Sequence, residues 1–114
     1  MSARVSELRG EVGSQVSEAQ AKEAAAKTVV VLLSIIKDAI GDLDHIVSVE
    51  KMSGFIRSAP DFVRQPQVID GASELLIDIF GEAGRHARTA TGTNQLPFGA
   101  AIQLDIVLRL KPFD

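Results

Sequence analysis

The stretch Ile102-Gln103-Leu104-Asp105-Ile106-Val107-Leu108-Arg109-Leu110 alternates aliphatic residues with mostly polar ones. A period of two predicts a β-strand that buries one of its faces in a hydrophobic core. The core face would carry Ile102, Leu104, Ile106, Leu108 and Leu110, and the other face Gln103, Asp105, Val107 and Arg109. That second face is therefore either solvated or part of a functional site.

A helical pattern precedes this strand. Residues 62–80 place apolar side chains three and four positions apart, Pro66 is acceptable in the first turn, and Gly81 and Gly84 follow the predicted end. The apolar stripe consists of Val68, Ala72, Leu75, Leu76, Ile79 and Phe80. Between this helix and the last strand, residues 86–93 predict a short polar strand and residues 94–97 a loop.

A longer helix is predicted over residues 17–40. Ser17 and Gln20 have the spacing of a capping box, and Gly41 is a natural stop signal. The β-branched run at 29–36 could by itself be a buried strand, but the cap before it and the absence of turn residues favour one continuous helix. We expect the second half of this helix to be buried on nearly all sides.

Two further strands complete the expected fold. Residues 45–57 alternate imperfectly, and Ser53-Gly54 would suit a bulge or a close backbone approach. Residues 5–13 give a weaker first strand, because Gly10 and Gly13 interrupt it. The sequence therefore predicts one α+β domain over residues 1–114, with two helices on one face of a mixed sheet.

Composition narrows the possible functions. The net charge is −3, the pI is near 5.3, and five Phe are the only aromatic residues, so nucleic-acid binding is disfavoured. No cysteine and only two histidines make a metal site hard to assemble, and we predict no metal or other cofactor. The apolar run at 28–36 is about half of the ~18–20 residues that span a bilayer, and no secretory signal is visible, so a cytoplasmic protein is expected.

Several short motifs together resemble the RidA/YjgF family. They are Gly41-Asp42-Leu43-Asp44, Ser58-Ala59-Pro60-Asp61-Phe62, Gly81-Glu82-Ala83-Gly84-Arg85-His86-Ala87-Arg88 and Leu96-Pro97 before the last strand. The sequence is most similar to the branch often labelled chorismate mutase-like, and the resemblance covers about residues 8–110. It implies a chorismate mutase-like α+β fold, a homotrimer, and clefts between subunits that bind small carboxylates.

The resemblance also implies a set of site residues. The arginine that grips the substrate carboxylate falls on Arg88, and the glutamate thought to activate the attacking water falls on Gln103. A neutral amide can hold a water molecule but cannot take its proton. Asp105 lies two residues along the same strand face, about 7 Å away, and could replace that carboxylate.

Three other positions belong to the same implied pocket. A family asparagine falls on Asp70, beside Gly71, and a cysteine of many relatives falls on Ala90. The charge of Asp70 would repel a carboxylate ligand, and its structural alternative is a solvated helix residue. The structural alternative for Arg88 is an ion pair with Glu82 or Asp105.

Three functions stay open at this point. The first is a module that binds or senses a keto acid or a related metabolite. The second is a hydrolase of enamines or imines, in which Arg88 holds the carboxylate and a water molecule lies on Gln103 or Asp105. The third is an endoribonuclease, which the acidic composition disfavours.

The front of the chain differs from the family pattern. Members carry an additional N-terminal hairpin that supplies pocket residues, whereas this sequence begins at about the segment that follows it. Either the chain is a truncated or misassigned reading frame, or it is a natural short form whose cleft is more open. A missing hairpin would also leave the helix at 17–40 and a sheet edge less covered, which would favour tighter oligomerisation or strand exchange.

Overall fold

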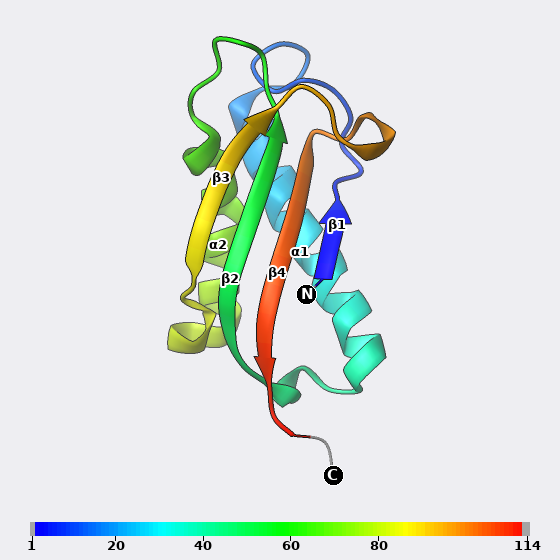
Figure 1. Cartoon of the computed structure of the whole chain (residues 1–114), viewed down its shortest axis with the longest axis vertical. Coiled ribbons are helices and arrows are strands. Elements are labelled where there is room, and N and C mark those ends of the chain that lie inside the picture. The colour runs from blue at the N-terminus through cyan, green and yellow to red at the C-terminus, as the bar shows by residue number, and fades with distance from the viewer. Residues whose placement is uncertain (1, 113–114) are drawn as a thin grey trace.

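A four-stranded mixed sheet carries both α-helices on one face in the computed structural model, which describes residues 2–112 (Figure 1). In spatial order the strands are β1 (Ser2–Val5), β4 (Ile102–Leu110), β2 (Ile46–Arg57) and β3 (Ala87–Thr93). β4 is antiparallel to both of its neighbours, and β3 is parallel to β2. The predicted α+β architecture is thus confirmed.

The first helix, α1 (Glu18–Ile40), begins at the predicted capping box. The Ser17 hydroxyl accepts from the Gln20 amide at 3.1 Å, and the Gln20 side chain accepts from the Ser17 amide at 2.9 Å. The β-branched run is therefore helical. Its burial is one-sided, since Val30 and Ile35 are 54% and 46% exposed, so the expected burial on all sides is wrong.

The second helix, α2 (Gln65–Phe80), begins three residues later than predicted, with Pro66 in its first turn. Val68, Ala72 and Leu76 of its predicted apolar stripe are fully buried, but Ile79 is 46% exposed and does not join the core. The helix also packs against α1. Gly71 lies at that helix contact, where an added Cβ would come within 2.2 Å of the Lys22 carbonyl oxygen. A side chain at residue 71 would therefore push the two helices apart.

The first strand does not lie where the sequence predicted it. β1 covers Ser2–Val5, and after it, within 6–13, the structure contains only isolated bridges, which Arg9 and Val12 form. Gly10 and Gly13 have φ values of +114° and +92°, outside the extended region, and they turn this segment away from a regular ladder.

Gly54 in β2 permits a close approach rather than a bulge. A Cβ at this position would lie 2.4 Å from Cδ1 of Ile69, so α2 packs directly onto the strand backbone. The register irregularities between β2 and β4 fall instead at Ile46/Ser48 and Val49/Lys51. Of the two roles suggested for Ser53-Gly54, only the close backbone approach is confirmed.

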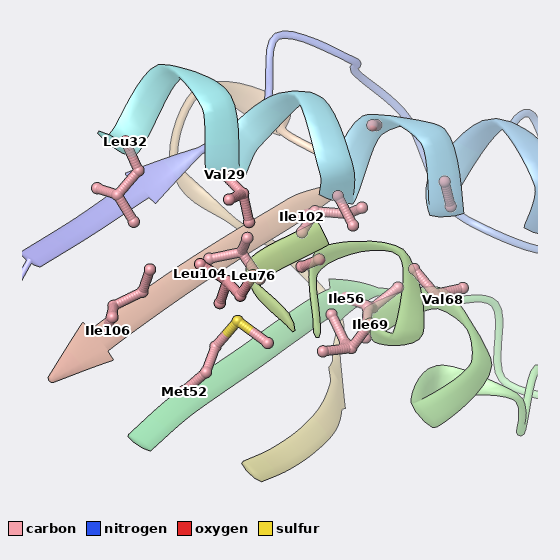
Figure 2. Close-up of a cluster of buried hydrophobic side chains, with 14 of the residues drawn as sticks. Val29, Leu32, Met52, Ile56, Val68, Ile69, Leu76, Ile102, Leu104 and Ile106 are labelled. Carbon is pink, nitrogen blue, oxygen red and sulfur yellow. The ribbon is translucent and has the colours of Figure 1, made fainter. Parts of the chain in front are cut away.

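The hydrophobic core fills the layer between the helices and the sheet (Figure 2). Figure 2 shows side chains from α1, α2, β2 and β4 meeting in this layer. Its largest fully buried members include Leu32, Met52, Ile56, Ile69, Leu76, Ile102, Leu104 and Ile106. Among the described residues, no helix combines the length and the apolar character needed to cross a membrane.

Candidate functional site

Arg88 lies in β3, at one free edge of the sheet. Its partner across the ladder is Met52, which is fully buried, so the Arg88 side chain leaves the sheet on the face that the helices cover. There the guanidinium meets α2: Nη1 donates to Oδ1 of Asp70 at 2.6 Å and to the Ser73 hydroxyl at 3.3 Å. The predicted arginine is thus held by the second helix.

Ser73 continues this contact to His86. The Ser73 hydroxyl lies 3.0 Å from Nε2 of His86, and Nδ1 of His86 lies 2.6 Å from the Gly84 carbonyl oxygen. Because a carbonyl oxygen only accepts, Nδ1 carries a proton, and in the corresponding neutral tautomer Nε2 accepts from Ser73. The serine oxygen can then accept from Arg88. A chain of hydrogen bonds from the Gly84 carbonyl through His86 and Ser73 therefore holds the guanidinium in place.

Local sequence explains why these groups meet. Asp70 and Ser73 are three residues apart on α2 and therefore share one face of the helix. At the end of α2, Gly84 packs so closely on the last turn that an added Cβ would lie 2.2 Å from the Leu76 carbonyl oxygen. Because the chain turns back so closely at Gly84, His86 and Arg88 lie along the side of α2.

Gln103 and Asp105 form a second polar group, on the opposite face of the sheet. They lie across the β2–β4 ladder from Phe55 and Ser53, and the buried Leu104 between them points to the core. The Gln103 amide donates to Oδ1 of Asp105 at 3.1 Å. The two side chains predicted to hold a water molecule are thus in direct contact.

The predicted site residues consequently separate into two groups within one chain. Arg88 and Asp70 lie on the helix side, and Gln103 and Asp105 lie on the side without helices. Ala90 is opposite Gly54 and packs against the core. Gly71 faces α1, so helix packing alone accounts for this glycine.

The ion pairs differ from the structural alternatives that the sequence suggested. Arg88 pairs with Asp70, whereas Glu82 pairs with Arg85 at 3.1 Å. Asp70 is therefore not simply a solvated helix residue. Sequence reasoning also missed Ser73 and His86, and the available signal was the three-residue spacing from Asp70 to Ser73 on a predicted helix.

Two of the hollows on the surface of the described chain are lined by none of the predicted site residues. One, of about 420 Å³, lies between β1 and α1 and includes Arg4, Glu7 and Thr28. The other, of about 490 Å³, includes Ile46 and Phe80. Within residues 2–112 no three His, Asp or Glu side chains gather as a metal site would require.

Comparisons with known proteins match nearly the whole chain. The family model described as "YjgF/chorismate_mutase-like, putative endoribonuclease" matches residues 6–108. Protein TCP17 of Trypanosoma cruzi is 39% identical over 105 residues, which are 91% of this chain and 66% of that protein, so the chain spans just under two thirds of TCP17.

Two solved structures are also similar to this chain. Atu1372 of Agrobacterium tumefaciens, whose function is given as unknown, has 39% identity and a TM-score of 0.93 over 97% of this chain and 74% of its own. A protein of Shewanella oneidensis, titled "putative endoribonuclease", has 26% identity and a TM-score of 0.87 over 91% of this chain and 69% of its own.

Proposed function

The chain belongs to the YjgF/chorismate mutase-like family, and from that premise we propose that it binds small carboxylates, keto acids or imino acids, at clefts between the subunits of a cytoplasmic homotrimer. The net charge of −3 gives little attraction for an RNA backbone. A small anion that one arginine can hold is therefore a better ligand for this chain than a nucleic acid.

The observation that carries this proposal is the state of Arg88. Its side chain is 27% exposed, the lowest value among the cations of the ion pairs in the described part of the chain. Only Nη1 is engaged, and within residues 2–112 the Nε and Nη2 donors make no hydrogen bond. A planar guanidinium with two free donors on one edge is suited to receive a carboxylate.

The sheet supports a site shared between chains. Gln103 and Asp105 point away from Arg88 within one chain, so a pocket that combines the two groups needs a second copy. The face that carries them also holds the half-buried apolar side chains of Val5, Phe55 and Val107, and no helix covers it. Apolar side chains on an uncovered sheet face favour association.

We expect Arg88→Ala to weaken the binding of pyruvate about thirtyfold, which corresponds to roughly 2 kcal/mol for a lost charge-assisted hydrogen bond. Isothermal titration calorimetry of pyruvate with the purified full chain measures this change. Arg85→Ala is the matched control, because Arg85 also pairs with a carboxylate and lies three residues away. The control should change the affinity less than twofold.

Two results would contradict the proposal. One is an Arg88→Ala variant that binds pyruvate as well as the unchanged chain does. The other is a molar mass by light scattering equal to the 12.2 kDa monomer, since a single chain has no intersubunit cleft. Three times the monomer mass is expected.

The contact between Gln103 and Asp105 favours a second candidate, hydrolysis of an enamine or imine. The Gln103 amide group is turned to the Asp105 carboxylate, so a water molecule at this pair would have a carboxylate base within reach. In this case Arg88 of one copy would hold the substrate carboxylate and the pair on another copy would direct the water.

The variant Gln103→Glu separates the two candidates. It replaces an amide that cannot take a proton by a carboxylate that can. With a 2-imino acid generated in situ, we expect ammonia release by this variant and none above background by the unchanged chain. Ammonia release by the unchanged chain that Arg88→Ala abolishes would establish the hydrolase instead.

A further inference from the structure

The pair formed by Arg88 and Asp70 leaves one half of each partner unused. The contact joins Nη1 to Oδ1 at 2.6 Å. Within the described residues, Nε and Nη2 of Arg88 and Oδ2 of Asp70 have no hydrogen-bond partner. The Asp70 side chain is 40% exposed, so solvent and a ligand can reach this carboxylate.

This arrangement places a negative charge beside the cation that would hold the ligand. A ligand carrying only a carboxylate gains attraction from Arg88 and loses part of it to repulsion from Asp70. A ligand carrying a cationic nitrogen next to its carboxylate meets an acceptor as well as a donor. Arg88 and Asp70 are in contact, so their opposite charges lie close together. They therefore match a ligand whose carboxylate and cationic nitrogen are separated by a single carbon atom.

The groups around the pair do not replace Asp70 in this role. Arg85, the nearest other arginine along the chain, is paired with Glu82, and Ser73 and His86 are hydrogen-bonded to each other and carry no negative charge. In the described site, Asp70 is therefore the anionic group in contact with Arg88.

We propose that Asp70 makes the Arg88 site selective for α-ammonium carboxylates over keto acids with the same carbon skeleton. The ligand carboxylate takes the free edge of Arg88, and the ligand nitrogen donates to the free oxygen of Asp70. This inference rests on the proposed carboxylate-binding function and names the class of ligand for that same site.

L-alanine and pyruvate test this selectivity, because they share three carbons and differ only in the group next to the carboxylate. We expect the full chain to bind L-alanine about tenfold more tightly than pyruvate. In Asp70→Asn, which keeps the shape and removes the charge, the preference should disappear or reverse. Calorimetric titration of both ligands measures the ratio of the two affinities.

Glu82→Gln is the matched control, since it removes a carboxylate from another arginine pair with the same change in net charge. The control should keep the preference for L-alanine. Equal or tighter binding of pyruvate by the unchanged chain, or an unaltered ratio in Asp70→Asn, would overturn the selectivity and leave carboxylate binding in place. Failure of both ligands to bind in a manner that depends on Arg88 would instead overturn the proposed function itself.

Discussion

Replacing Gly71 by alanine is expected to lower the free energy of unfolding by roughly 3 kcal/mol. The new Cβ would lie 2.2 Å from the carbonyl oxygen of Lys22 and 2.9 Å from Cγ of the same residue. A backbone oxygen inside a helix cannot move aside as the end of a side chain can, so α1 and α2 must separate. Urea denaturation followed by circular dichroism measures the loss.

The sign of the change in the free energy of unfolding tests whether α1 and α2 are in close contact at Gly71. At an open position in a helix, glycine to alanine stabilises by about 1 kcal/mol. A stabilised Gly71→Ala variant would therefore contradict the close helix contact. Gly92→Ala is the control, because its Cβ would meet chiefly the flexible amide end of Gln65, at 2.9 Å, and it should cost less than about 1 kcal/mol.

The substitution Leu104→Ala is expected to cost about 3.5 kcal/mol, because it leaves a cavity in the middle of the core. Leu104 is fully buried in β4, between the two strands that flank it. Its cross-strand neighbour in β2 is Gly54, which has no side chain that could relax into the space. Figure 2 shows Leu104 within the layer of buried side chains that would be left incomplete.

Leu110→Ala is the matched control for this cavity. Leu110 lies at the end of the same strand and is 37% exposed, so its truncation should cost less than about 1 kcal/mol. The same urea titration compares the two variants. A Leu104→Ala variant as stable as Leu110→Ala would mean that the core does not close around β4 as described.

The periodic parts of the fold were predictable because each depends on neighbours in sequence. The capping box at Ser17 and the strict alternation after Ile102 fix a helix start and a strand without reference to the rest of the chain. The first strand could not be predicted from sequence neighbours, since glycines with positive φ at 10 and 13 interrupt any local pattern. Its true position depends on pairing with β4, about 100 residues away.

The candidate site was predictable only residue by residue. Alternation shows that Gln103 and Asp105 share a face, but the face on which Arg88 lies depends on how β3 registers against β2. The pairing of Arg88 with Asp70 joins residues 18 positions apart and requires the packing of α2 beside β3. No local pattern contains that information, so the structural alternative for Arg88 named Glu82 and Asp105 as partners and not Asp70.

The pairing of Arg88 with Asp70 also changes what the asparagine-to-aspartate difference means. The sequence suggested simple repulsion of a carboxylate ligand. In the structure the same carboxylate pairs with Arg88 and, among the described residues, keeps its second oxygen free. Under the proposed selectivity, the difference would act on the choice of ligand as well as on the affinity.

The place of β4 in the sheet has a consequence for biosynthesis. β1 and β2 both pair with β4, although β4 follows every other helix and strand in chain order. While a ribosome is still making residues 102–110, the apolar sides of both helices have no completed sheet to cover. The nascent chain therefore keeps these apolar helix sides uncovered until β4 has emerged, and the sheet cannot close before residues 102–110 have left the ribosome.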